Sequence, residues 1–175
     1  TETDQTPSTL SRDYAFNFTQ EPAPAVTIYS GKITTYRQLA SEAVDQLKHI
    51  FPNLGHSKTA STPLPGATFG EMSFDSYLSY AKDKYHWLDQ PIFKRYLNTY
   101  GTTMEEILLG CTQMDDLGMK FGSGLYQSEV DYLVKKEWAY NTDDILWRRT
   151  KLGLSVTKVD QEIQREYLCE EKNLD

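Results

Sequence analysis

The spacing of the apolar residues beyond residue 71 constrains the fold of this chain more than any other feature. In the first run, Phe74, Tyr77, Leu78, Ala81 and Tyr85 recur at helical spacing, which places them on one face of an α-helix. Comparable runs occupy residues 91–100, 102–109, 126–138, 142–149 and 156–167. This part of the chain is therefore predicted to form a bundle of short helices.

Residues that favour helix ends separate these runs. Pro91 stands where a helix is expected to begin and Gly101 where it is expected to end, the positions at which proline and glycine are favoured. Thr102 with Glu105 has the spacing of a capping box. Thr142 is expected to cap the short helix that follows it.

Strand patterns occur only near the start of the chain. Tyr14, Phe16 and Phe18 alternate with smaller or polar residues, and Val26–Tyr29 is a second β-branched and aromatic run. A two-stranded hairpin is only marginally stable in water, and the helical remainder supplies no further strand. Because the chain also opens on Thr1 rather than Met, we expect it to be a fragment whose sheet continues elsewhere.

A helix and a linker follow the strands. The helix is expected to start at a capping box of Thr35 and Gln38 and to stop at Pro52. A segment rich in Pro, Gly, Ser and Thr then reads as a linker. The predicted fold is mainly α (α+β), and its parts are a hairpin with one helix (1–52), a linker (53–70) and a helical domain (71–175).

The composition excludes several classes of function. A net charge of −7 disfavours nonspecific binding to nucleic acid or anionic lipid. No apolar run approaches the roughly 20 residues that span a bilayer, and no signal-peptide pattern opens the chain. Cys111 and Cys169 lack motif spacing, which favours a reducing compartment. The histidines are scattered, so we predict no metal site.

One turn has the features of an anion site. Gly31 permits close approach of a ligand, the N–H groups around Ile33 and Thr35 lie at a helix start, and Lys32 adds a charge. A P-loop is excluded, because Val26 and Ile33 occupy positions where it requires Gly and Ser or Thr. An ordinary helix start beside an exposed lysine accounts for the same residues, and on the residues alone we favour it.

Several motifs follow one another in order along the chain. They are Ser11-Arg12-Asp13-Tyr14, the run from Gly31 to Arg37, Leu64-Pro65-Gly66, Asp116-Leu117-Gly118, Glu129, Tyr132-Leu133, Glu137-Trp138, and Asp144 to Gly153. Any one motif alone is weak, but together they resemble FAD-dependent glycerol-3-phosphate dehydrogenases, and the resemblance covers nearly the whole chain. One departure is Ser30-Gly31, where that family usually has two glycines.

The resemblance implies roles for particular residues. Cofactor-binding residues are implied at Gly31, Lys32, Ile33, Thr34 and Thr35, with the turn against the flavin of FAD. Substrate contact is implied for Arg12 and Lys32, the alternative for Arg12 being an ion pair with Asp13 or Glu21. No catalytic residue is assigned, since the chain has no G-x-G-x-x-G dinucleotide fingerprint after a strand. We therefore expect FAD only in the full-length protein, and an inactive fragment.

The resemblance also implies partners and a location. The full-length enzyme would oxidise glycerol 3-phosphate, pass electrons to quinone, and lie in the cytoplasm, peripheral at the cytoplasmic membrane. Two alternatives stay open, a glycerophosphate oxidase that uses oxygen and a helical module for interaction or membrane docking. The hairpin edges and the apolar face of Tyr36 to Phe51 predict that the fragment self-associates.

The densest basic cluster has a structural interpretation. Arg148, Arg149 and Lys151 lie close in sequence to Asp144 and Glu137, and clustered charges on a short helix usually pair with neighbours. We expect an ion-pair network here rather than a lipid or partner site. Trp138 and Trp147 are expected in the core or at a domain interface.

Overall fold

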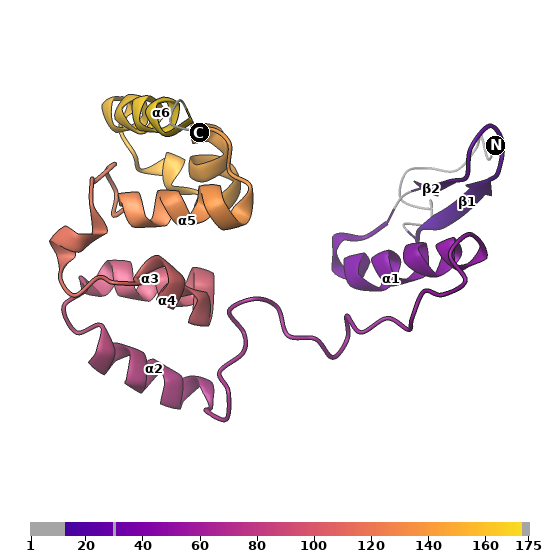
Figure 1. Ribbon diagram of the computed structural model, residues 1–175, viewed down its shortest axis with the longest axis horizontal. Coiled ribbons are helices and arrows are strands. Elements are labelled where there is room, and N and C mark those ends of the chain that lie inside the picture. Colours follow the sequence, from indigo (N-terminus) through magenta and orange to yellow (C-terminus); the bar gives the residue numbers. More distant parts are fainter. Residues whose placement is uncertain (1–12, 30, 173–175) are drawn as a thin grey trace, which may run out of the picture. The chain divides into compact units, whose positions relative to one another are not determined.

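The computed structural model describes residues 13–29 and 31–172. The chain divides into two compact units, Thr1–Pro63 and Leu64–Asp175, which are described separately (Figure 1). Helices dominate the order of elements, so the predicted mainly α class is confirmed. In the part of the chain that the structure describes, no helix is both long and apolar enough to cross a bilayer.

The first unit contains the predicted hairpin and helix (Figure 1). Strands β1 (Ala15–Thr19) and β2 (Ala25–Tyr29) pair antiparallel, with Phe16 opposite Ile28. A short 3₁₀ turn, Ile33–Thr35, leads into α1 (Tyr36–Gln46). The sheet has two strands among the described residues, as the alternating pattern predicts.

The described residues of this first unit form no buried core. None of the side chains described between residues 13 and 63 is classed as buried. Ile33 is 89% exposed and Tyr36 is 64% exposed. Apolar residues of α1, including Tyr36 and Val44, are therefore open to solvent, as are Ile28 and Tyr29 of β2.

The predicted capping box at the start of α1 is wrong. Thr35 does occupy the N-cap position, but its side chain caps no helical N–H; its hydroxyl donates to the Lys32 carbonyl at 3.0 Å. The Gln38 amide donates to Glu42 Oε1 at 2.9 Å instead of reaching back to the cap. Because the Thr35 hydroxyl bonds to the carbonyl that precedes the adjoining 3₁₀ turn, the capping box does not form.

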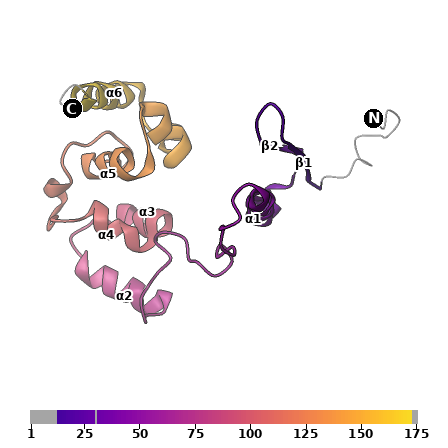
Figure 2. The same ribbon diagram turned by 45° about the vertical axis from the view of Figure 1, so that its right-hand side comes forward.

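The second unit is a bundle of short helices, stacked in chain order in the view of Figure 2. A π-helical turn, Asp144–Arg149, replaces the short α-helix expected there, and its N-cap residue is Asp143 rather than Thr142. The helices are α2 (Phe74–Lys84), α3 (Gln90–Tyr100), α4 (Met104–Ile107), α5 (Gln127–Glu137) and α6 (Lys158–Lys172).

A single apolar core fills this second unit. Tyr77, Tyr96, Phe121, Leu133 and Leu146 are each no more than 2% exposed. They come from different elements of the bundle and belong to one contiguous cluster. Burial of this many large side chains gives the unit a core of its own.

Two glycines fix the path of the chain into the bundle. Gly101 ends α3 with φ +56°, as predicted. The Gly66 carbonyl accepts a hydrogen bond from the Thr102 N–H at 2.9 Å, and a Cβ added to Gly101 would lie 2.0 Å from that carbonyl oxygen. Residues 64–70, placed in the linker by the sequence, thus lie with the helical unit.

The capping box expected from Thr102 and Glu105 is also wrong. Thr102 lies inside a 3₁₀ turn, Gly101–Thr103, and α4 begins only at Met104. The Glu105 carboxylate accepts a hydrogen bond from Lys84 on α2 instead. Glu105 therefore pairs with Lys84 of another helix instead of capping its own.

Candidate functional site

The predicted anion site lies on the turn between β2 and α1. Gly31 has φ +130°, a backbone conformation that side-chain-bearing residues rarely adopt. A Cβ at this position would also lie 3.0 Å from Leu39 Cδ1. The turn therefore requires glycine both for its backbone and for the close packing of α1 beneath it.

The turn is accessible from outside the unit. Gly31, Lys32, Ile33 and Thr34 are exposed, and Thr35 is half-buried. The Thr35 N–H already donates to the Lys32 carbonyl at 3.0 Å. The N–H groups before it, at the start of the helical segment, have no intrahelical acceptors, and partial positive charge gathers there. The arrangement can stabilise a negative charge placed against the turn, but it contributes no acid or base.

Two residues were predicted to contact the substrate, and one of them, Lys32, lies among the described residues. The Lys32 ammonium lies 3.4 Å from Asp13 Oδ1, and both side chains are at least half exposed. Such an exposed pair exchanges readily for another anion, because it is worth little in water. Arg12 lies outside the described residues, so its role and the contact of Lys32 with a substrate stay predictions.

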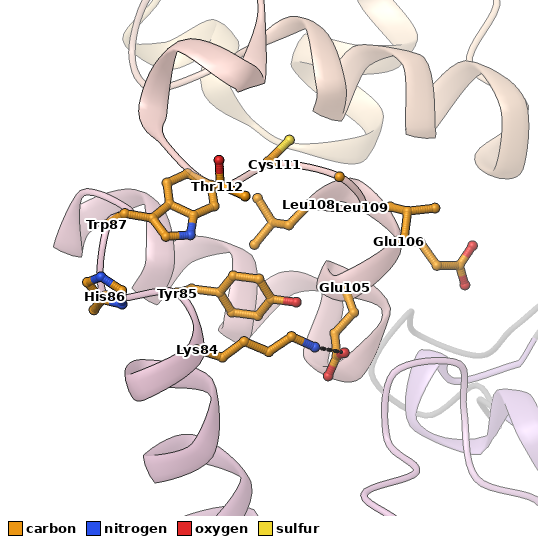
Figure 3. Close-up of a pocket in the computed structure, with 11 residues that line it drawn as sticks. Lys84, Tyr85, His86, Trp87, Glu105, Glu106, Leu108, Leu109, Cys111 and Thr112 are labelled. Carbon is orange, nitrogen blue, oxygen red and sulfur yellow. Dashed lines mark hydrogen bonds and ion pairs between the residues drawn. The ribbon is translucent and has the colours of Figure 1, made fainter.

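A separate pocket lies in the helical unit (Figure 3). It has a volume of about 690 Å³, and its walls include Tyr85, Trp87 and Leu108. Lys84 Nζ lies 2.6 Å from Glu105 Oε2 at its edge, and the Tyr77 hydroxyl donates to the same carboxylate at 3.1 Å.

Three ionisable groups of this pocket, on Lys84, Tyr85 and Cys111, have raised pKa values. The hydrogen bond to Glu105 raises the pKa of Lys84, and burial raises the pKa of Tyr85 and of the Cys111 thiol. Each shift holds the proton more firmly. We therefore assign the pocket no catalytic role.

A buried ionic cluster in the core was missed by the sequence analysis. Glu129 is fully buried, and its carboxylate accepts hydrogen bonds of 2.6 Å from both Arg95 nitrogens and from the Tyr100 hydroxyl. Arg95 also donates to the Gly124 carbonyl at 2.8 Å. The signal was present, since Glu129 directly precedes Val130 inside the apolar stripe of α5.

The ion pairs predicted for the basic cluster are confirmed for Arg148 and Arg149, whereas the Lys151 ammonium donates to the Trp147 carbonyl. Arg148 lies 2.7 Å from Asp144, and Arg149 lies 3.2 Å from Glu137. The Asp144 carboxylate also accepts the Tyr140 N–H at 2.9 Å, and this hydrogen bond is the largest cause of its lowered pKa. These contacts hold the segment from α5 to the π-helical turn in one compact arrangement.

Trp138 does not belong to the core. It is 77% exposed and ends α5 in the left-handed conformation, with φ +56°. Trp147 is 41% exposed and lies against Gly153, where an added Cβ would meet its ring at 2.5 Å. Of the two expected places for these tryptophans, the core is therefore excluded for Trp138.

The chain resembles known proteins along almost its whole length. A family described as the C-terminal domain of alpha-glycerophosphate oxidase matches residues 57–168. Glycerol-3-phosphate dehydrogenase of Pseudomonas aeruginosa is 43% identical over 170 residues, which is 94% of this chain and 32% of the relative. Aerobic glycerol-3-phosphate dehydrogenase of Escherichia coli is 34% identical over 166 residues, 94% of this chain and 33% of the relative.

A relative that is named for a different substrate also matches. D-erythritol 1-phosphate dehydrogenase of Brucella abortus is 36% identical over 156 residues, which is 89% of this chain and 31% of the relative. The chain thus spans about a third of the length of these curated relatives.

Proposed function

The chain belongs to the family of the C-terminal domain of alpha-glycerophosphate oxidase, and from this premise we propose that it is the carboxy-terminal portion of an FAD-dependent glycerol-3-phosphate dehydrogenase. The observation that carries the proposal is the extent of the similarity. Relatives with that name match 94% of the chain, a share too large for the helical unit alone to supply.

The proposed reaction converts glycerol 3-phosphate to dihydroxyacetone phosphate. The secondary alcohol loses a hydride and a proton, and the flavin, when bound, supplies the hydride acceptor. The electrons then pass to quinone. We assign the proton-accepting base to no residue of this chain.

The turn fits a role beside the flavin. Gly31 offers a surface without a side chain, and the turn from Gly31 to Thr35 is largely exposed. Backbone N–H groups at the start of this helical segment would stabilise negative charge that builds on an adjacent ring, because fixed dipoles need no reorganisation. Lys32 would exchange Asp13 for the substrate phosphate, with Arg12 as a second, forked contact.

The remaining parts of the proposal concern the longer protein. FAD binding and turnover would require the portion outside this chain, so the chain alone would be inactive. Because quinones are lipid-soluble, an enzyme that reduces them would act from the cytoplasm at the membrane surface. The open apolar face of the first unit would be covered by the sheet of that other portion, or by a second copy in the isolated chain.

Lys32→Ala in the longer enzyme tests the substrate contact. Losing one charge-assisted hydrogen bond to phosphate should raise KM for glycerol 3-phosphate about tenfold. Lys48→Ala is the matched control, because Lys48 is an exposed lysine of the same unit, paired with Asp45. An unchanged kcat/KM in the Lys32 variant would reject the assignment.

Arg12→Ala tests the second contact by substrate comparison. The loss should be smaller for glycerol than for glycerol 3-phosphate, because only the latter carries the phosphate. Equal losses on both substrates would exclude a phosphate contact at Arg12.

A second candidate substrate comes from the Brucella abortus relative, which is named for D-erythritol 1-phosphate. Both compounds are polyol monophosphates, so Lys32 and Arg12 would serve either. Steady-state kinetics with the two substrates, each with quinone or oxygen as acceptor, distinguishes a glycerol-3-phosphate dehydrogenase from an erythritol-phosphate enzyme and from an oxidase. A longer enzyme that oxidises neither substrate would leave the helical interaction module as the better proposal.

A further inference from the structure

Another cavity of the helical unit lies between α2 and α3, which are neighbouring layers of the bundle in both views (Figure 1, Figure 2). We call it the α2–α3 pocket. Its volume is about 490 Å³ and nine residues line it. This volume lies within the range of pockets that hold small molecules.

More than half of the lining of the α2–α3 pocket is apolar. Phe93 and Leu97 of α3 are 3% and 5% exposed and belong to the core of the unit. Phe74 and Leu78, which lie on successive turns of α2, and Pro91 of α3 complete the apolar part. A hydrocarbon chain placed against these side chains would be removed from water, which is favourable for every methylene group buried.

The polar residues of the pocket carry positive charge or none. Lys82 belongs to α2 and Lys94 to α3, while Gln90 and Asn98 supply neutral amides. All four are exposed, so the pocket opens at the surface. Among the described residues that line it, none is Asp or Glu, although the chain has 25 acidic residues. Two cations without an acid favour an anionic ligand.

These two lysines differ from the lysine of the pocket in Figure 3. There Lys84 is neutralised by Glu105, whose carboxylate oxygen lies 2.6 Å from the ammonium nitrogen. Lys82 and Lys94 form no ion pair with any residue that the structure describes. An anion that enters the α2–α3 pocket therefore has no carboxylate of the described chain to displace.

An apolar lining beside two unpaired ammonium groups fits a molecule with the same two parts. We propose that the α2–α3 pocket binds an amphiphilic anion, a single alkyl or acyl chain that carries one carboxylate or phosphate head. The chain would lie against Phe74, Leu78 and Leu97, and the head would accept hydrogen bonds from Lys82 and Lys94. This site is independent of the proposed dehydrogenase reaction, because it shares no residue with the turn between β2 and α1.

Two larger partners fit these observations less well. A protein partner typically covers about 20–30 residues on each side, whereas nine residues line this pocket. An anionic bilayer meets the charge of a whole face of the protein, and the net charge of −7 opposes it. A single molecule inside the pocket is influenced mainly by the two lysines, because charges beyond about 8 Å are screened at physiological ionic strength.

Isothermal titration calorimetry of the 175-residue chain with monomeric decanoate tests the proposal. Decanoate should bind, and decyltrimethylammonium, which has the same chain and the opposite charge, should bind at least about tenfold more weakly. Hexanoate should also bind at least about tenfold more weakly, because it has four fewer methylene groups to bury. Absence of decanoate binding overturns the proposal, as does equal binding of decanoate and either of the other two compounds.

A double variant, Lys82→Gln with Lys94→Gln, locates the site. Its affinity for decanoate should fall about tenfold, because two charged donors are lost. Both lysines are exposed, so the fold should be retained, which circular dichroism checks. The matched control is Lys120→Gln with Lys135→Gln, which removes the same charge from exposed lysines outside the pocket. Equal affinities in the two double variants would show that the proposal is wrong.

Three further titrations separate the sources of such an anion. Decyl phosphate in place of decanoate identifies the preferred head, and a preference for either head supports the proposal. Inorganic phosphate that binds as tightly as decyl phosphate would show a simple anion site with no apolar part, which refutes the proposal. Phosphatidylglycerol vesicles that bind the chain when decanoate does not would show a membrane contact, which also refutes it.

The same titration of the longer protein tests whether the pocket stays open there. Decanoate should bind with the affinity measured for the 175-residue chain. Loss of binding would mean that another portion of the polypeptide covers the pocket, and the proposal would be wrong. Decanoate binding by a longer protein that has no dehydrogenase activity refutes the proposed function and supports the pocket.

Discussion

The two units of this chain differ in how far they bury their aromatic residues. In the helical unit Tyr77 is 2% exposed, whereas Tyr36 in the hairpin unit is 64% exposed. Both residues occupy apolar stripes of helices of the same length, 11 residues. The comparison shows that an amphipathic stripe predicts a buried face but does not say which segment buries it.

The reason lies in what surrounds each stripe. The face of α2 meets other helices of its own bundle, and a core of many side chains results. The face of α1 meets a two-stranded hairpin, which is too small to cover it. We infer that the helical unit stabilises itself, while the hairpin unit depends on a surface supplied by another segment or chain.

Tryptophan fluorescence follows the unfolding of the helical unit without a signal from the hairpin unit. Trp87, Trp138 and Trp147 are the three tryptophans of the chain, and all lie in the helical unit. The largest effect is expected for Glu129→Ala, which leaves the Arg95 guanidinium without its buried partner. Unfolding by urea, followed by fluorescence, should show a loss of about 3–5 kcal/mol.

The matched control is Glu106→Ala, which removes an exposed pair with Lys136 at 3.4 Å. Its effect should stay within about 1 kcal/mol. A loss of similar size for both variants would contradict the view that burial makes the Glu129 cluster costly to break.

The next largest effect contrasts the two units directly. Leu133 is 1% exposed in the helical core, whereas Val44 on α1 is 50% exposed. Leu133→Ala should lower the free energy of unfolding by about 3 kcal/mol, because it leaves a cavity. Val44→Ala should change the free energy of unfolding of the hairpin unit, measured by hydrogen exchange of the α1 amides, by about 0.5 kcal/mol or less. A large loss at Val44 in the chain alone would show that a hidden core exists in the first unit.

A smaller effect is expected at the turn of the hairpin unit. Gly31→Ala should destabilise that unit by about 1–3 kcal/mol, because its φ of +130° is almost restricted to glycine. Hydrogen exchange of the α1 amides measures this loss. Gly55→Ala is the control, since a Cβ there meets nothing within 4 Å. An equal loss of stability at both glycines would contradict the requirement for glycine at position 31.

The smallest effect is a pH dependence confined to the helical unit. Hydrogen bonds from Thr112 lower the pKa of Asp116, and the Tyr140 N–H lowers the pKa of Asp144. A carboxyl whose pKa is lower in the folded state stabilises it above the unfolded pKa, and this contribution disappears as pH falls through the folded value. Stability should therefore decline below about pH 4, and the double variant Asp116→Asn, Asp144→Asn should flatten that decline.

Much of the fold could be predicted from the sequence. Periodicity, a local property of the sequence, predicts the hairpin and the apolar stripes of α1, α2, α3 and α5. Glycine, an equally local signal, predicts the end of α3 at Gly101. The predicted capping boxes at Thr35 and Glu105 were wrong because these side chains bond elsewhere. The Thr35 hydroxyl bonds to the Lys32 carbonyl of a 3₁₀ turn, and the partner of Glu105 is distant in the chain. Glu105 bonds to Lys84, which is 21 positions away in the chain.

The candidate site could be predicted in part. The layout of strand, turn and helix start around Gly31 was predicted from residue types, because glycine beside a helix start is a local signal, whereas the binding role of Gly31 to Thr35 came from the family resemblance and stays a prediction. The exposure of Trp138 could not be found, since the same stripe that buries Leu133 continues into it and only the left-handed end of α5 turns the ring outward. The burial of Glu129 could not be predicted either, because it depends on Arg95, whose position opposite Glu129 only the structure shows.

The Glu129 cluster also has a consequence for how the bundle assembles. A carboxylate inside hydrocarbon is tolerable only where α3 delivers both guanidinium nitrogens and the Tyr100 hydroxyl to it. If α3 slid along α5 by one turn, the acid would be stranded without counterion or donor. The cluster therefore favours the observed register of α3 against α5 over a shifted one, because a shifted pairing leaves the Glu129 carboxylate buried without a partner.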